Sequence, residues 1–278
     1  MSLKTIIVHI DSTPRCSARI KLAAQLAIEY DAHLIGVAPS GWPPMAMMPA
    51  MRDPMVPVTA VDAGPIRTRG ESALAAFEVQ VGALGVASVE TRLVEEEDGL
   101  ALAMHGLCSD LIIVGQARGA GSESAARSDF PEWVMMNGAA PVLVVPAHGE
   151  FATIGTRVAV AWNGSIEARR AIGSALPMLR KADKVHLLMI NADGNINGGT
   201  DMGLYLTRHG VNAELDADTN TDASSRDAGQ ALIAASAECG ADLLVMGAYG
   251  RSRMREMLMG GASRTMLESM QVPVWMAH

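Results

Sequence analysis

Glycines and arginines gather in one stretch of the chain, residues 247–265, in a pattern that suits phosphate binding. The stretch contains four of each: Gly247, Gly250, Gly260, Gly261, Arg251, Arg253, Arg255 and Arg264. Glycine lets the backbone approach a ligand closely. A helix that starts after such a loop offers unpaired N–H groups and a favourable dipole to an anion. The stretch therefore predicts a phosphate-binding loop, with a solvated basic turn as the alternative.

The elements around this loop must position it. An apolar run at residues 242–246 precedes the loop and is typical of a buried parallel strand, and residues 266–270 after it favour a helix. A second turn, residues 162–165, follows another apolar strand at 157–161. In a doubly wound sheet, ligands bind at the carboxyl ends of the strands, where the strand order reverses. We therefore expect the loop and the turn to meet at that edge.

The pattern of strands and helices occurs twice. Five strands separated by helices precede residue 146, and the same order begins again at residue 157. The run DLIIVG at 110–115 aligns with DLLVMG at 242–247. The sequence thus predicts an α/β protein of two duplicated doubly wound domains, residues 1–148 and 154–278. Each domain is expected to hold a five-stranded parallel sheet flanked by helices.

Composition narrows the class of protein. The 278 residues are 49% hydrophobic and carry a formal net charge of -8, which is typical of a globular chain and argues against a nucleic-acid partner. No apolar run approaches the roughly 18 residues of a membrane span. The first apolar run ends at Asp11 without a signal cleavage site. The 3 cysteines are widely spaced and form neither a disulfide framework nor a metal motif. We expect a cytoplasmic protein with no metal site of its own and no membrane partner.

The second half resembles the universal stress protein family. That family's nucleotide motif is a glycine, two residues, a second glycine, nine residues and a third glycine followed by Ser or Thr. Gly247, Gly250 and Gly260 match its spacing. Asn163 matches the family's Asp in the first turn, and Ile190 lies near a position whose backbone contacts adenine. The resemblance covers both halves outside residues 39–65 and implies the strand order 3-2-1-4-5 in each domain, as in a tandem member of the family.

The resemblance also implies a ligand. The C-terminal domain is expected to bind ATP or a related adenine nucleotide, with Mg as a companion ion, and to act as a stress sensor or signalling module. Backbone N–H groups of the loop would hold the phosphates, and Asn163 would hold the ribose or adenine side. The candidate nucleotide-binding residues are Ala161, Trp162, Asn163, Ile190, Met246, Gly247, Gly250, Arg251, Gly260, Gly261, Ala262, Ser263 and Arg264.

The chain departs from the family motif in both halves. Gly261 replaces the hydroxyl residue after the third glycine, and Asn163 keeps a carbonyl acceptor in place of the carboxylate. Ser263 is expected to supply the missing hydroxyl and an N-cap, and Arg264 a planar guanidinium suited to phosphate. In the first half Asp11 is retained, but Arg118 stands at the second-glycine position. We expect no nucleotide in the first half, whose pocket is either vestigial or takes another small ligand.

Alternatives to nucleotide sensing remain open at this stage. The Met- and Pro-rich loop at residues 39–65 could serve a non-nucleotide stress scaffold that binds a protein or an apolar partner. Slow adenine-nucleotide hydrolysis is a third hypothesis, although no catalytic residue is identified. The short last strands, 142–145 and 274–276, are expected to pair within one chain and so mimic a dimer. Association of two chains into a homodimer is left open.

Overall fold

The computed structural model describes residues 2–40, 64–116, 130–151, 153–190, 196–219, 225–249 and 261–278. Most of the expected partner-binding loop, residues 41–63, lies outside these ranges. So do Arg118 in the first half and Gly250, Arg251 and Gly260 in the second. The predictions made for these residues therefore stay predictions.

Both halves alternate strands and helices, and each contains the five strands expected from the sequence. The first half holds β1 (Thr5–His9), α1 (Cys16–Tyr30), β2 (His33–Pro39), α3 (Gly64–Leu84), β3 (Val89–Val94), α4 (Asp98–His105), a short 3-10 helix (Gly106–Cys108), β4 (Leu111–Gly115), α5 (Phe130–Asn137) and β5 (Val142–Val145). The second half holds β6 (Arg157–Ala161), α6 (Ile166–Leu179), β7 (Lys184–Ile190), α7 (Ile196–Arg208), β8 (Ala213–Thr219), α8 (Ser225–Glu238), β9 (Leu243–Gly247), α10 (Ala262–Ser269) and β10 (Val274–Ala277).

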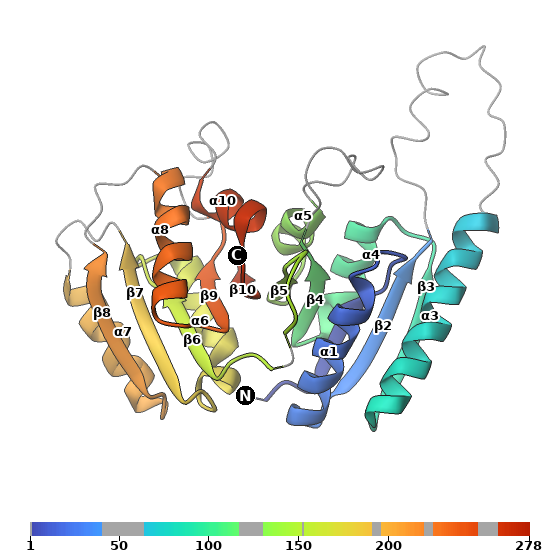
Figure 1. The fold of residues 1–278 in the computed structure, drawn as a ribbon, viewed down its shortest axis with the longest axis horizontal. Coiled ribbons are helices and arrows are strands. Elements are labelled where there is room, and N and C mark those ends of the chain that lie inside the picture. Colours follow the sequence, from blue (N-terminus) through green and yellow to red (C-terminus); the bar gives the residue numbers. More distant parts are fainter. Residues whose placement is uncertain are drawn as a thin grey trace, which may run out of the picture.

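All ten strands form one sheet in the order β3-β2-β1-β4-β5-β10-β9-β6-β7-β8 (Figure 1). Neighbouring strands pair parallel within each half, so each half has the order 3-2-1-4-5 in its own count. At the centre β5 and β10 pair antiparallel, with Leu143 opposite Trp275. The predicted α/β fold class is confirmed, and so is the pairing of the two last strands within one chain.

Side chains that alternate along the buried strands build a core on each face of the sheet. Ile6 and Val8 of β1 pack in a core with residues of α1, α3, α6 and α7. Ile7 between them packs in the opposite core, with residues of α4, α5, α8 and α10. Burial on both faces explains why the strands read as continuous apolar runs. Each such side chain contributes about 1.5–3 kcal/mol when it is fully buried.

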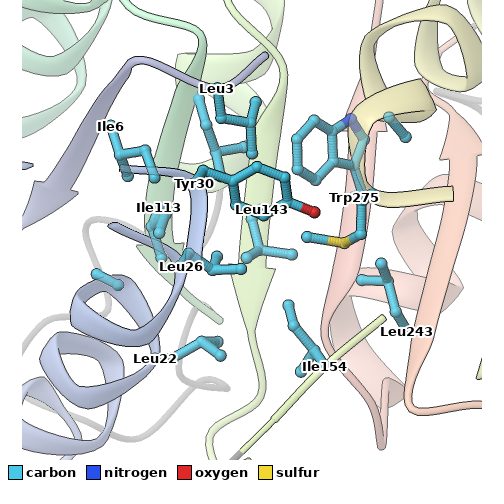
Figure 2. Packing of buried hydrophobic residues seen from close by; sticks show 14 of the residues in the cluster. Leu3, Ile6, Leu22, Leu26, Tyr30, Ile113, Leu143, Ile154, Leu243 and Trp275 are labelled. Carbon is cyan, nitrogen blue, oxygen red and sulfur yellow. The ribbon is translucent and has the colours of Figure 1, made fainter. Parts of the chain in front are cut away.

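The two halves share a core across the seam between β5 and β10 (Figure 2). Trp275 is fully buried there, and its Nε1 donates a hydrogen bond to Ser174 Oγ at 2.9 Å. Tyr30 from the first half belongs to the same cluster (Figure 2), and Lys181 of the second half places its Nζ 4.0 Å from the centre of the Tyr30 ring. The halves are therefore joined by side-chain packing as well as by the β5–β10 ladder.

Helix α10 begins at Ala262, whereas the sequence favoured a helix only from residue 266. Its extra turn packs closely against α8: a Cβ placed at Gly229 would lie 2.7 Å from Thr265 Cβ and 3.1 Å from the Ala262 carbonyl oxygen. Contact with a neighbouring helix stabilises this added turn, since a short helix gains most of its stability from packing. The helix N-terminus is thereby placed four residues nearer to the glycine loop.

Candidate functional site

The candidate site lies at the carboxyl ends of β6 and β9, which are neighbours in the sheet. β6 leads along the chain to β7 on one side, and β9 leads to β10 on the other. This is the position in the second half where the strand order reverses, and two helices, α6 and α10, begin there. Doubly wound sheets bind ligands at such switch points, and helix N-termini favour anions.

The turn after β6 is held by side chains of its own. Asn163 Oδ1 accepts a hydrogen bond from the Ser165 backbone N–H at 3.1 Å, and Gly164 between them has a φ of 75°. Ser165 is the N-cap of α6, because its Oγ accepts from the Ala168 N–H at 3.1 Å. The carbonyl of Asn163 is thus engaged within the turn, which leaves its Nδ2 amino group to donate to a ligand.

Gly247 at the end of β9 lies directly against the first turn of α6. A Cβ at this position would meet the Ala168 backbone N–H nitrogen, and it would lie 2.6 Å from the Glu167 carbonyl carbon and 2.8 Å from Ala168 Cα. These atoms belong to the backbone and cannot rotate away. Only glycine therefore fits here, and the close approach fixes the start of the glycine loop against the N-terminus of α6.

The start of α10 differs from the expectation in one important respect. Its N-cap is Gly261, which has no side chain to cap the helix, and the predicted N-cap role of Ser263 is wrong. Ser263 is 3% exposed and lies inside the helix, where its Oγ accepts a hydrogen bond from the Tyr249 N–H at 3.3 Å. Its hydroxyl therefore ties α10 to the chain just after β9. The first N–H groups of α10 have no partners within the helix.

Arg264 does not point its charge at the helix start in this structure. Its Nε donates to Glu268 Oε1 at 2.8 Å, one turn further along α10, and about two thirds of its side chain is exposed. Glu268 raises the pKa of the Arg264 guanidinium, and Glu132 of α5 adds to this effect. The predicted contact between Arg264 and a phosphate would require this pair to open.

The remaining candidate residues are Trp162, Met246, Ala161 and Ile190. Trp162 links β6 to its neighbours, since its N–H donates to the Leu188 carbonyl at 2.9 Å and its Nε1 donates to the Gly198 carbonyl of α7 at 2.9 Å. Met246 is 4% exposed and packs in the core below the site, so only its backbone faces the edge of the sheet. Ala161 and Ile190 end β6 and β7 at this same edge.

Glu167 is a residue that the motif search missed. It lies in the first turn of α6 beside Gly247, and its Oε2 is buried without a hydrogen bond from any residue that the structure describes. An acidic residue in a first helical turn is a common sequence feature, so only the packing against Gly247 singles it out. A carboxylate at this position repels any other negatively charged group that comes close to it.

In the first half, an ion pair lies at the corresponding edge of the sheet. Asp11 forms the same turn as Asn163, with its Oδ1 accepting from the Thr13 N–H at 2.9 Å. However, Arg19 of α1 occupies the space beside Gly115, where a Cβ would lie 2.6 Å from its Nη1. Arg19 is 2% exposed and pairs with Asp11 Oδ2 at 3.0 Å, and its Nε donates to the His9 carbonyl at 2.8 Å.

Charges around Asp11 determine its ionisation. Burial raises the pKa of this carboxyl, but Arg19, His9 and two hydrogen bonds from Thr13 more than offset that effect and lower the pKa to about 2. The carboxylate is therefore ionised at neutral pH. Beside Gly247 the backbone of Glu167 and Ala168 takes the place that the Arg19 guanidinium has beside Gly115.

The described residues give no support for a metal site or a membrane-spanning helix. No group of three or more His, Cys, Asp or Glu side chains is arranged to hold a metal ion in the part of the chain that the structure describes. Within the same ranges, no helix is long and apolar enough to cross a bilayer.

Comparison with known proteins agrees with this geometry. The fold and the site define a doubly wound α/β protein in which Gly247 and the N-termini of two helices lie at the switch point. The model of the universal stress protein family matches residues 156–278, which make up nearly all of the second half. No curated protein sequence matches the chain significantly.

Solved structures extend the likeness to the whole chain. A universal stress protein from Archaeoglobus fulgidus is 16% identical with a TM-score of 0.76, covering 98% of this chain and 95% of that one. A universal stress protein from Pseudomonas aeruginosa is 14% identical with a TM-score of 0.58, covering 99% and 93%. An Archaeoglobus fulgidus universal stress protein in complex with dAMP is 15% identical with a TM-score of 0.36, covering 52% and 98%. The two full-length likenesses establish the shared fold of both halves.

Proposed function

We propose that the second half, residues 154–278, binds ATP or a related adenine nucleotide, and that the chain acts as a sensor or signalling module in a stress response. One observation carries the proposal: the N-termini of α6 and α10 meet the end of β9 at the switch point of the sheet, where Gly247 allows the closest backbone approach. Two helix N-termini together supply unpaired N–H donors and positive potential to phosphate groups. The match of the family model to residues 156–278 adds to this support.

Each described residue has a role in the proposal. The N–H groups of Gly261, Ala262 and Ser263 bind the phosphates, since they open α10. Asn163 donates its Nδ2 to the ribose or adenine side, and the backbone near Ile190 contacts the adenine. Gly250, Arg251 and Gly260 complete the loop by their spacing in the sequence. Mg would arrive with the phosphates, because the described residues supply no cluster of metal ligands.

The first half is proposed to bind no nucleotide. In the first half the buried guanidinium of Arg19 lies beside Gly115 and pairs with Asp11. Replacing an ordered ion pair by a ligand would leave Asp11 buried without its partner, which is costly. The domain boundaries at residues 148 and 154, a cytoplasmic location and any pairing of two chains belong to the same proposal.

The proposal is tested by ligand identification followed by thermal shift. Freshly purified protein is denatured, and the released small molecules are identified by mass spectrometry. ATP at 100 times its Kd should stabilise the protein by about 2.7 kcal/mol, which corresponds to a rise in Tm of roughly 5–10 °C.

A pair of asparagine variants locates the site. Asn163→Ala should reduce the thermal shift, because it removes the donor at the β6 turn. Asn137→Ala is the matched control: its Nδ2 donates to the Trp133 carbonyl at 2.8 Å in the first half, away from the site. If no nucleotide is released and millimolar ATP leaves the Tm of the wild-type protein unchanged, the proposed function is wrong.

A further inference from the structure

A side chain from the first half reaches across the seam to the helix that opens the nucleotide site. Gln116 follows β4, and its Nε2 donates a hydrogen bond to the Leu267 carbonyl of α10 at 2.8 Å. Its Oε1 accepts from the Ala147 N–H at 2.8 Å, and its own N–H donates to the Val145 carbonyl at 2.8 Å. Gln116 is thus held at the carboxyl end of β5 by its backbone N–H and its side-chain oxygen, and its side-chain nitrogen reaches α10.

The bond satisfies a group that α10 itself cannot satisfy. Carbonyls in the last turn of a helix lack partners within the helix, and Leu267 lies in that turn. The helix spans only Ala262–Ser269, so its two ends are roughly 10 Å apart. A helix this short moves as one unit. A constraint on Leu267 therefore also limits where the N–H groups of Ala262 and Ser263 lie.

In the second half, the residue that matches Gln116 cannot form the equivalent contact with the first half. Ala248 occupies the position in the second half that Gln116 occupies in the first: its N–H donates to the Ala277 carbonyl just as that of Gln116 donates to Val145. Alanine has no amide with which to reach α5. The described residues therefore couple the first half to the helix of the second-half site, without the reverse contact.

A charge interaction also links α5 of the first half to α10 of the second half. In Figure 1, α5 and α10 lie on either side of the seam between β5 and β10. After the larger effect of Glu268, Glu132 of α5 raises the pKa of Arg264 in α10. Glu132 and Arg264 are equivalent positions in the two halves, 132 residues apart, so the duplication has placed opposite charges across the seam.

We propose that Gln116 is a positioning residue through which the first half sets the nucleotide affinity of the second. This inference rests on the proposed function. A phosphate site bound by helix N–H groups gains affinity when those groups are held in place before the ligand arrives, because ordering them otherwise costs free energy at binding. Linkage then requires that nucleotide binding stabilise the Gln116–Leu267 contact in return.

The test compares two glutamine variants in the full-length chain. Gln116→Met keeps the length of the side chain and removes both hydrogen bonds of the side-chain amide. It should weaken ATP binding about three- to tenfold by calorimetry, the range of one lost hydrogen bond. In the ligand-free protein it should also speed hydrogen exchange at the amides of α10. Gln80→Met is the control, because Gln80 Nε2 donates to the Ser17 carbonyl at 2.8 Å within the first half. It should change neither quantity.

A third variant separates the two bonds of Gln116. Gln116→Glu keeps an acceptor for the Ala147 N–H but turns a carboxylate toward the Leu267 carbonyl, at the negative end of α10. It should weaken binding at least as much as Gln116→Met. Wild-type affinity and wild-type α10 exchange in both Gln116 variants overturn the positioning role while leaving nucleotide binding intact. If the wild-type protein binds no ATP, the proposed function fails, and the effect on affinity inferred for Gln116 is overturned with it.

Discussion

Replacing Gly247 with alanine should disrupt the candidate site more than any other single methyl group. The added Cβ would lie 2.6 Å from the Glu167 carbonyl carbon and 2.8 Å from Ala168 Cα. Ordinary carbon contacts are about 3.5–4.0 Å, so β9 and the start of α6 must separate by roughly 1 Å. Overpacking of this kind costs about 1–3 kcal/mol, or roughly 2–10 °C in Tm. The same displacement pulls the loop away from the α6 N-terminus, so ATP binding should fall at least tenfold.

Gly115→Ala is the matched control for this experiment, since Gly115 ends β4 as Gly247 ends β9. There the added Cβ would meet Arg19 Nη1 at 2.6 Å, the far end of a long side chain that can adjust its torsions. We expect a smaller loss of Tm and unchanged ATP affinity. Thermal unfolding with and without ATP, combined with calorimetry, measures both quantities. Equal losses of ATP affinity in the two variants would refute the role assigned to the close approach at Gly247.

Two further predictions concern charge. Because the pKa of Asp11 is lowered from 3.8 to about 2, its stabilisation is present above pH 4 and is lost as the pH falls toward 2. The difference in unfolding free energy between the wild-type protein and Asp11→Asn should therefore narrow by about 2 kcal/mol between pH 6 and pH 2, and a constant difference in urea titrations would contradict this. Glu167→Gln should tighten ATP binding about two- to fivefold at low salt and less at high salt, since it removes a negative charge beside the site. Unchanged affinity at low ionic strength would show that Glu167 does not face the phosphates.

The elements of the fold were predictable because each is specified by local sequence. Continuous apolar runs predict parallel strands buried on both faces, and the repeat of DLIIVG as DLLVMG predicts the duplication. The strand order came from the family resemblance, and the sheet confirms it in both halves. The turn at Asn163 was also placed correctly at the carboxyl end of β6.

The details of the site depend on contacts that no local pattern encodes. Ser263 reads as a helix cap, but packing against Gly229 extends α10 past it and buries its hydroxyl. In the sequence, nothing distinguishes Arg19 from other arginines on an amphipathic helix. Only the folded sheet places it beside Gly115. Gln116 and Leu267 are separated by 151 residues, so their bond exists only after the two halves have joined.

The number of nucleotides bound per chain tests the central claim most directly. Native mass spectrometry of the full-length protein with saturating ATP would measure it without a label. One ATP per chain, with occupancy reduced in Gly247→Ala and retained in Gly115→Ala, is the predicted result, because in the first half the Arg19–Asp11 ion pair lies at the corresponding edge of the sheet. No bound ATP, or two ATP molecules per chain, would contradict the account.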